Sequence, residues 1–383
     1  MPKQLLFITW YTGLGGGETA LLALADALDP ARYLPHLTAP REGQLTAQWR
    51  KRGWPVHILP FRGASTWFVP FIWARFPIVG KLRTLIREQG FAAVYSDYHS
   101  LPYALPAAED AQIPAIWMCH GWWFKPKFWQ RGFFRRPSAT GFAASWTVRD
   151  GFLGSPPFMP PEQLPVLALG VNTQRFKPDI DGLPLRHEFN ISPDAPLVAL
   201  IARFQDVKGH DIFQDMARLV AAEIPEARFI VAGDNVHGVS ADDAYKARIL
   251  GRWKDDPLLS QIIQYIGFRE DAERVIAAAD VIACTSHFES YGMVNLEAMA
   301  SGKPVVSTRR GGPSETILEG VTGYLVDAGD AAQFAARITT LLRDPALRQQ
   351  MGAAGRTHVI RQFSAEHMAA QFMAALDRAI SGV

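Results

Sequence analysis

The sequence is poor in cysteine, in long apolar runs and in net charge. Its 383 residues include only two cysteines, Cys119 and Cys284, with no CxxC spacing. Neither a disulfide framework nor a zinc site is expected, and a reducing compartment is the default. No stretch approaches the ~20 apolar residues of a membrane span, and the run from Leu5 to Trp10 is too short for a signal peptide. We expect a cytoplasmic protein.

Acidic residues are scarce in one part of the chain, although the formal net charge is only +2. Residues 43–149 contain 14 Lys/Arg and 4 Asp/Glu, and ten of the eleven tryptophans lie in the first 150 residues. Two segments concentrate this pattern, Trp67–Lys81 and Gly121–Arg136 (which includes Trp122, Trp123 and Trp129). If exposed, they would place aromatic rings among lipid headgroups and cations on anionic lipid. We expect association with the inner face of the membrane, and no nucleic-acid partner. Alternatively, the segments cover an acceptor site or fill the core.

The chain is long enough for two domains. Short β-rich runs alternate with amphipathic stretches, which predicts an α/β fold with parallel sheets and right-handed crossovers. Expected strands lie at 5–9, 92–95, 115–118 and 141–144, and then at 197–201, 228–232, 264–266, 281–284 and 304–307. We predict two Rossmann-like domains, 1–165 and 166–363, with a cleft between them. A final helix in 364–383 is expected to cross back to the first domain.

Residues 286–315 carry the sharpest chemical pattern. Gly292 follows an expected strand and lets the backbone turn into a helix near Met293, whose free N–H groups suit an anion such as a diphosphate. Glu289 precedes this helix, and Glu297 lies about one turn inside it, eight positions later. Carboxylates placed in this way suit sugar hydroxyls. For an isolated Glu297, the alternative is a capping or solvated residue.

A second pattern follows the expected strand at 197–201. Arg203 and Lys208 are five residues apart, so both cations can reach one site. A planar guanidinium fork and a compact ammonium group are a common combination at phosphates. The alternative is two surface cations on a loop.

These patterns resemble the E-x7-E region of retaining GT-B glycosyltransferases of family four (the group 1 type). Ser301–Val306, Gly311, Gly312 and Glu315 also match the family pattern. The resemblance implies a GT-B fold, with two parallel sheets facing across a cleft, and retaining, metal-independent hexosyl transfer. Glu289 would meet the transferred hexose and Glu297 the nucleotide ribose. Arg203 and Lys208 would clamp the diphosphate in place of a metal.

In the first domain the resemblance covers the glycine loop and one histidine. Gly15 and Gly16 match the loop that approaches the donor phosphate. His120 follows an expected strand, where open α/β folds place ligands, and the family often has a histidine here that contacts the transferred sugar. Asp97 and His99 are lesser candidates for acceptor contact.

The resemblance gives the complete set of expected site residues. Catalytic roles fall on Glu289, His120, Arg203 and Lys208. Donor-binding roles fall on Gly15, Gly16, Arg203, Lys208, Asp234, Phe268, Arg269, Tyr291, Gly292, Met293, Val294 and Glu297. The DxD sequence Asp179–Asp181 lies in the interdomain linker, and we interpret it as coincidence. No metal or other cofactor is expected.

The donor is expected to be a UDP-sugar, with GDP-mannose second, and the acceptor a glycan or lipid-linked molecule of cell-envelope polysaccharide or lipopolysaccharide synthesis. A nucleotide-sugar epimerase of GT-B architecture and a non-catalytic sugar-binding protein are the alternatives. A nicotinamide dehydrogenase is more distant, because Glu18 occupies the last glycine position of the dinucleotide pattern.

Overall fold

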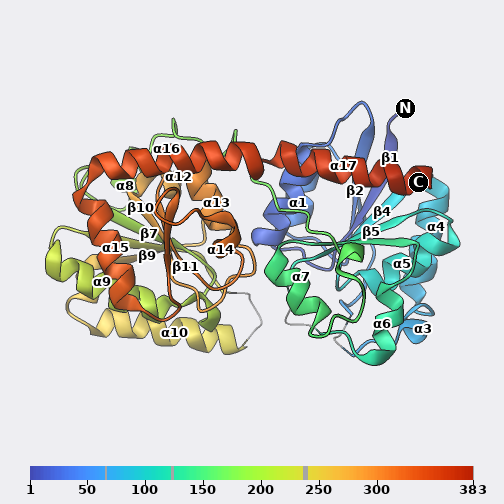
Figure 1. Cartoon of the computed structure of the whole chain (residues 1–383), viewed down its shortest axis with the longest axis horizontal. Coiled ribbons are helices and arrows are strands. Elements are labelled where there is room, and N and C mark those ends of the chain that lie inside the picture. Colours follow the sequence, from blue (N-terminus) through green and yellow to red (C-terminus); the bar gives the residue numbers. More distant parts are fainter. Residues whose placement is uncertain (65–66, 122–124, 236–239, 383) are drawn as a thin grey trace. The chain divides into compact units, whose positions relative to one another are not determined.

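The computed structural model describes residues 1–64, 67–121, 125–235 and 240–382. The chain forms two compact units, Met1–Gly170 with Ala365–Val383, and Val171–Ser364. Each unit contains a six-stranded parallel sheet flanked by helices (Figure 1). The prediction of an α/β fold with two parallel sheets is confirmed.

The first sheet has the strand order β3-β2-β1-β4-β5-β6. Its strands are β1 (Lys3–Ile8), β2 (Tyr33–Ala39), β3 (Val56–Ile58), β4 (Ala93–Asp97), β5 (Ala115–Cys119) and β6 (Ala139–Ala143). The helices of this unit are α1 (Gly16–Asp26), α2 (Gln44–Lys51), α3 (Pro70–Trp73), α4 (Pro77–Gln89), α5 (Leu101–Asp110), α6 (Phe128–Phe134), α7 (Trp146–Leu153), η1 (Pro161–Gln163) and α17 (Ala365–Ser381).

Strand β1 is apolar on both faces, as expected for a strand covered on two sides. Leu6 and Ile8 join the core cluster formed with α4, α5 and α7. On the opposite face Phe7 packs against Phe372 of α17, with ring centroids 6.5 Å apart. Helix α17 also contacts α1, so the last helix belongs to the first unit.

The boundary between the units lies after Gly170, five residues later than the sequence suggested. Residues just after 165 still belong to the edge of the first sheet. Ala143 of β6 forms a parallel bridge with Val166, and Leu167 N donates to Ala143 O at 3.0 Å. These backbone bonds keep the segment with the first unit.

The sequence prediction missed β2, β3 and, in the second unit, β12. Strand β2 contains Pro35, which lacks an N–H group and argues against an inner strand. The structure accommodates it because β3 pairs only with Leu37–Ala39. Pro35 therefore has a partner on the β1 side alone, where it lies opposite Leu5.

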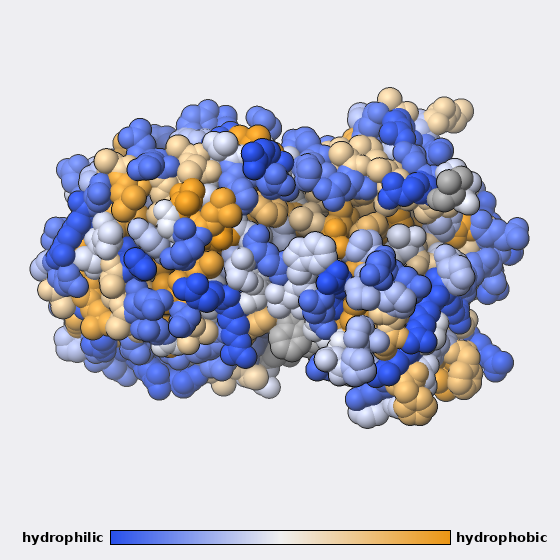
Figure 2. Space-filling view, in the orientation of Figure 1, coloured by the Kyte–Doolittle hydropathy of each residue, from blue (hydrophilic) through white to orange (hydrophobic). Residues whose placement is uncertain are grey.

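The two aromatic and basic segments meet on the surface of the first unit. The Trp67 and Trp129 ring centroids are 5.9 Å apart, and the Lys127 ammonium lies 4.6 Å from the Trp67 ring centroid. Phe71 and Phe128 are 67% and 80% exposed. Apolar side chains among polar ones are visible over α3 and α6 at the lower right of Figure 2.

Other members of these segments are internal or lie outside the described residues. Phe133 and Phe134 are buried in the core of the first unit, so part of 121–136 does fill the core. Trp122 and Trp123 lie outside the described residues. In the described part of the chain, no helix is both long and apolar enough to cross a bilayer.

The second sheet has the strand order β12-β11-β10-β7-β8-β9. Its strands are β7 (Leu197–Ile201), β8 (Arg228–Ala232), β9 (Ile263–Gly267), β10 (Val281–Cys284), β11 (Val305–Thr308) and β12 (Gly323–Val326). Its helices are α8 (Leu183–Glu188), η2 (Asp206–Lys208), α9 (His210–Glu223), α10 (Ser240–Asp255), α11 (Leu259–Ile262), α12 (Ala272–Ala278), α13 (Met293–Ala300), α14 (Pro313–Thr316), α15 (Ala331–Arg343) and α16 (Pro345–Gln362).

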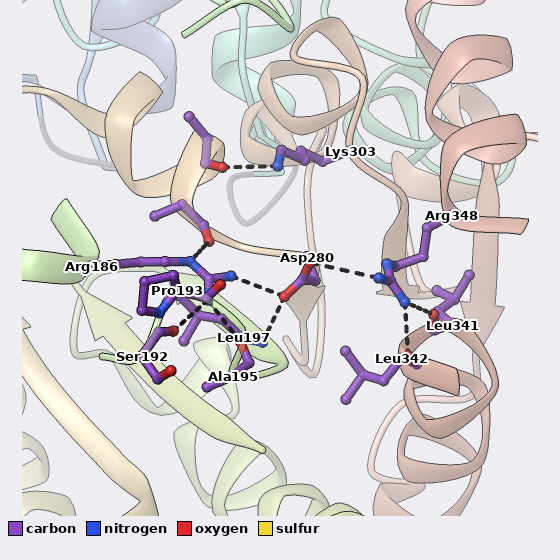
Figure 3. A network of polar contacts seen from close by, with 12 residues as sticks. Arg186, Ser192, Pro193, Ala195, Leu197, Asp280, Lys303, Leu341, Leu342 and Arg348 are labelled. Carbon is purple, nitrogen blue, oxygen red and sulfur yellow. Dashed lines mark hydrogen bonds and ion pairs between the residues drawn. The ribbon is translucent and has the colours of Figure 1, made fainter. Parts of the chain in front are cut away.

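A polar network fixes the amino ends of β7 and β10 (Figure 3). Asp280 accepts from Arg186 at 3.0 Å and from the Leu197 N–H at 2.8 Å. Arg186 also donates to four backbone carbonyl groups, among them those of Ala278 and Ala195. Because the Arg186 guanidinium is engaged in these bonds, we interpret the network as structural. It fixes where β7 and β10 begin, and therefore where their carboxyl ends lie.

A histidine pair in the first unit makes stability depend on pH. His36 Nδ1 lies 3.2 Å from His57 Nε2, and the His36 ring packs edge-on against Phe91. Burial, followed by the nearby His57, lowers the pKa of His36 to about 4, and burial lowers that of His57. Because the unfolded chain binds these protons more readily, their contribution to stability is full above pH ~6.5 and is lost as pH falls towards 4.

We therefore expect the melting temperature to fall between pH 7 and pH 5, and His36→Asn to flatten this dependence. Thermal unfolding followed by circular dichroism at several pH values measures both. His187→Asn, at a histidine of the second unit outside the pair, is the control. Equal pH slopes for wild type and His36→Asn would contradict the assignment.

Candidate active site

The centre of the candidate site is an ion pair between Lys208 and Glu289. Lys208 Nζ lies 2.7 Å from Glu289 Oε2, and the two side chains are only 19% and 14% exposed. Ser286 Oγ donates to the same carboxylate oxygen at 3.2 Å. Glu289 Oε1 accepts no hydrogen bond from the described residues, so one face of the carboxylate is open to a ligand hydroxyl.

The loops that carry this pair are tied to each other and to the sheet. Thr285 Oγ1 donates to Gly209 O at 2.9 Å, and His287 N donates to Val207 O at 2.8 Å. Glu289 itself forms a parallel bridge with Gly311. Strands β7 and β10 are neighbours, so their carboxyl ends bring Lys208 and Glu289 together.

Helix α13 begins immediately after this loop. Its N-cap residue is Gly292, with φ +87°, a conformation that suits glycine. Met293 and Val294 form the first turn, where backbone N–H groups have no carbonyl partner within the helix. This end of the helix favours an anion. Tyr291, the residue before the cap, is buried.

Glu297 lies inside α13 and is 8% exposed. Burial raises its pKa to about 7, although Arg175 acts in the opposite direction. Its carboxyl group accepts no hydrogen bond from the described residues. A buried carboxyl group with unused hydrogen-bonding capacity is costly unless a ligand supplies the missing partners.

Arg203 follows β7 and has an exposed side chain. Within the described ranges its guanidinium forms no ion pair or side-chain hydrogen bond. It therefore remains available for a ligand, but no direct contact joins it to Lys208 or Glu289. The predicted joint action of the two cations on one diphosphate stays a prediction.

Three other predicted donor residues lie at the ends of β8 and β9. Asp234 follows β8, and its carboxylate pairs with Lys246 of α10. Phe268 follows β9 and is 43% exposed. The Arg269 guanidinium is engaged by Asp271 at 2.8 Å and by Glu188. The Arg269 side chain is therefore engaged in ion pairs, and its role towards a donor stays a prediction.

The predicted residues of the first unit lie at the carboxyl edge of its own sheet. Gly15 caps α1, and its N–H donates to Glu18 at 2.9 Å; Gly16 is the first helical residue. A Cβ on Gly17 would lie 3.9 Å from His120 Nδ1, so the glycine loop and His120 are close. The roles of Gly15, Gly16 and His120 towards a donor stay predictions.

His120 is half-buried after β5, and its Nδ1 has no hydrogen-bond partner among the described residues. Burial lowers its pKa to about 4, although Asp97 acts in the opposite direction. The ring is therefore neutral at pH 7 and offers one donor and one acceptor to a ligand.

The DxD sequence has ordinary structural partners. Lys177 Nζ donates to Asp179 at 3.1 Å, and the Leu183 N–H donates to Asp181 at 2.9 Å. In the parts of the chain that the structure describes, no group of three His, Cys, Asp or Glu residues is arranged to hold a metal ion. Cys119 and Cys284 are buried free thiols.

Sequence reasoning missed the direct partners of the site. Ser286 was seen only as the start of the motif, but its position two residues after β10 was a usable signal. Lys246 gave no signal, because its contact with Asp234 joins a helix to a strand end through the fold. Arg175, whose charge acts on Glu297, lies 122 positions away from it in the chain, so no local pattern indicated this contact.

Two family models match the chain. Glycosyl transferases group 1 matches residues 184–358, which contain the Lys208–Glu289 pair and α13. Glycosyltransferase Family 4 matches residues 14–175. The chain therefore resembles glycosyltransferases of these two families in both of its units. Each model matches one of the two units, and together they cover most of the chain.

Curated relatives match this chain over part of their length. N-acetyl-alpha-D-glucosaminyl L-malate synthase of Bacillus anthracis is 32% identical over 198 residues, 51% of this chain and 49% of that protein. D-inositol 3-phosphate glycosyltransferase of Mycobacterium sp. (strain KMS) is 35% identical over 190 residues, 49% of this chain and 41% of that protein. The chain spans about half the length of the curated relatives it matches or less.

Solved structures share the fold of this chain over nearly its full length. Anabaena Alr3699/HepE in complex with UDP and glucose has a TM-score of 0.80 at 22% identity, and covers 97% of this chain and 99% of its own. A glycosyltransferase from Rickettsia africae has a TM-score of 0.83 at 17% identity, with full coverage of both chains. The predicted GT-B fold is confirmed.

The buried carboxyl group of Glu297 predicts a second pH effect, opposite in sign to that of the histidine pair. Its folded pKa of about 7 lies above the ordinary value of 4.5, so the folded state holds this proton more tightly. Its stabilising contribution is present below pH 4.5 and is lost as pH rises through 7.

Glu297→Gln should therefore be more stable than wild type at pH 8, by up to on the order of 2–3 kcal/mol, with a smaller gain at pH 5. Denaturant unfolding at both pH values measures this, with the exposed Glu226→Gln as control. A gain that is absent at pH 8, or equal at both pH values, would refute the assignment.

Proposed function

We propose that this chain transfers a hexosyl residue from a nucleotide-sugar to a glycan or lipid-linked acceptor, with retention at the anomeric carbon and without a metal ion. A UDP-sugar is the favoured donor, and GDP-mannose is second. Cell-envelope polysaccharide or lipopolysaccharide synthesis is the proposed setting.

The observation that carries the proposal is the contact between Lys208 and Glu289 beside the start of α13. An ammonium group and free helix N–H groups suit a diphosphate, and the neighbouring carboxylate suits sugar hydroxyls. Arg203, uncommitted after β7, adds a second cation. One unit thus carries complementary groups for both halves of a nucleotide-sugar.

The reaction breaks the bond between the anomeric carbon and the phosphate oxygen and forms a bond to the acceptor oxygen on the same face. The acceptor hydroxyl proton passes to the departing phosphate oxygen. Positive charge develops on the sugar and negative charge on the diphosphate, so stabilising the leaving group lowers the barrier. Lys208, Arg203 and the start of α13 do this, while Glu289 orients the sugar.

The relatives support the choice of donor and class of acceptor. HepE has been solved with UDP and with UDP-glucose, which favours UDP. Another relative, 32% identical over 182 residues, is the lipopolysaccharide core biosynthesis glycosyltransferase LpsE of Rhizobium meliloti. It favours an envelope glycan as acceptor.

The first test is release of UDP from UDP-sugars, chosen from a nucleotide-sugar panel by protection against thermal unfolding. Lys208→Ala should lower kcat/KM by about 10²–10³-fold, because the leaving group loses a preorganised charge. Glu289→Gln should also lower kcat, since its neutral amide orients the sugar less strongly. Lys177→Ala, at a partly exposed lysine of the same unit, is the control. Wild-type turnover by Lys208→Ala would overturn the proposal.

The reaction products distinguish a transferase from an epimerase and from a sugar-binding protein. An epimerase would convert the nucleotide-sugar without releasing UDP, and a binding protein would be stabilised by it without turnover. Retention is read from the anomeric configuration of the product by NMR. Trapping a sugar on Glu289 would contradict direct transfer on one face.

The first unit carries a surface that we propose binds an anionic membrane. It consists of Trp67, Phe71, Phe128 and Trp129, and we name it the aromatic surface. The cations Arg75, Lys81, Lys125, Lys127 and Arg131 flank it in sequence. Exposed aromatic rings beside cations suit the headgroup region of an anionic bilayer. A lipid-linked acceptor would then be met at the membrane.

Phe128→Ser should weaken binding to vesicles of phosphatidylcholine and phosphatidylglycerol about tenfold, because a buried phenyl group contributes about 1.5–3 kcal/mol. Co-sedimentation measures this, with Trp146→Ser, an exposed tryptophan outside the aromatic surface, as control. Binding of the wild-type chain to the vesicles should weaken at high salt, and it should be weaker with vesicles of pure phosphatidylcholine. Unchanged binding of Phe128→Ser, Phe71→Ser and Trp129→Ser would exclude the surface.

A further inference from the structure

The carboxyl edge of the first sheet presents two aromatic side chains that the core does not use. Trp10 and Tyr11 follow β1 and are 40% and 36% exposed. Their ring centroids are 5.2 Å apart, with the ring planes at 73°. The His99 ring, after β4, lies 5.6 Å from Tyr11 and 6.1 Å from Trp10. Together the three rings form an exposed aromatic corner.

The aromatic corner is held by the loops around it. Trp10 N donates to Asp97 Oδ2 at 3.2 Å. Ala64 N donates to His99 O at 2.8 Å, and His99 Nδ1 lies 3.0 Å from Ala64 O. A Cβ on Gly63 would lie 2.7 Å from Trp10 Cδ2, so the backbone of this loop lies directly against the indole. The rings are therefore positioned before any ligand arrives.

A fixed, exposed indole keeps apolar area in water that folding has not removed. Such area is favourable only when a ligand covers it. One face of a pyranose chair matches it, because its C–H bonds form an apolar patch of similar size while its hydroxyls lie at the rim. Carboxyl ends of parallel strands are also where α/β sheets bind ligands.

Two exposed arginines follow strands at this same edge of the first sheet. Arg62 immediately precedes Gly63, and Arg41 follows β2, the strand beside β1. Both side chains are exposed, and neither forms an ion pair or side-chain hydrogen bond with the residues that the structure describes. Guanidinium groups bind carboxylates and phosphates through two parallel hydrogen bonds. The excess of basic residues in 43–149 also favours an anionic ligand.

We propose that the aromatic corner stacks a sugar ring of the acceptor and that Arg62 binds an acidic substituent on it. The acceptor is then an acidic glycan, bearing a carboxylate or a phosphate. This proposal adds to the proposed transferase function. It depends on that function only in identifying the bound glycan as the acceptor. Glycan binding by the first unit is measurable without turnover.

The probe is an oligosaccharide array with neutral, uronate-containing and phosphorylated members, followed by titration of bound members by tryptophan fluorescence. Acidic members should bind, and neutral ones of the same size should bind at least about tenfold more weakly. Trp10→Ala should weaken binding about tenfold or more, whereas Trp10→Phe keeps part of it. Arg62→Gln should remove the preference for acidic over neutral members.

The control variants for glycan binding differ from those used for the donor site. Trp146→Ala and Lys51→Gln change an exposed aromatic and an exposed cation elsewhere on the same unit, outside the aromatic surface, and should bind as wild type. Circular dichroism checks that each variant is folded. Uronate and phosphate members separate the two sources of charge, and either preference supports the proposal.

Three results would overturn the proposal: no bound member, equal binding of neutral and acidic members, or wild-type binding by Trp10→Ala. Stabilisation of the wild-type chain by UDP is measured in parallel. If UDP has no effect but acidic glycans bind, then the transferase proposal fails and the glycan site stands.

Discussion

A single ion pair connects the chemistry of the second unit to its fold. Lys208 and Glu289 are 81 positions apart in the chain and meet only because β7 and β10 are neighbours in the parallel sheet. Removing one partner of a pair so little exposed leaves the other charge poorly compensated. The loops are therefore constrained twice, by their backbone bonds and by these charges. A diphosphate would compete with Glu289 for Lys208, so ligand binding and loop position are linked.

The same sheet edge is used differently in the two units. In the second unit it presents cations, helix N–H groups and two carboxyl groups, which suit a charged nucleotide and a sugar. In the first unit it presents Trp10, Tyr11 and two exposed arginines, Arg41 and Arg62, which suit a glycan ring with an acidic group. The amino ends of β7 and β10 are instead closed by Arg186 and Asp280, whose bonds are internal. The candidate binding residues therefore lie at the carboxyl ends of the strands, and the internal hydrogen bonds of Arg186 and Asp280 lie at the amino ends.

The strands that could be read from sequence were those with uninterrupted apolar runs. Leu197–Ile201, Arg228–Ala232 and Val281–Cys284 have the bounds expected. Strand β2 was hidden by Pro35, β3 has only three residues, and β12 begins with Gly323, a residue type depleted in strands. In each missed case the strand forms because neighbouring strands complete its pairing, which is not a local property. The boundary after Gly170 was displaced for the same reason, through the bridge between Ala143 and Val166.

The sequence alone determined the fold class and the order of chemical groups along the chain, because these follow from local periodicity and from motifs. Tertiary structure alone decided which groups meet. It paired Lys208 with Glu289, engaged Arg269 with Asp271 and Glu188, and left the Arg203 side chain exposed. It also buried Glu297 without a partner and raised its pKa. Partners and burial depend on residues far apart in the chain, and only the folded sheet brings them within the few ångströms at which charges and hydrogen bonds act.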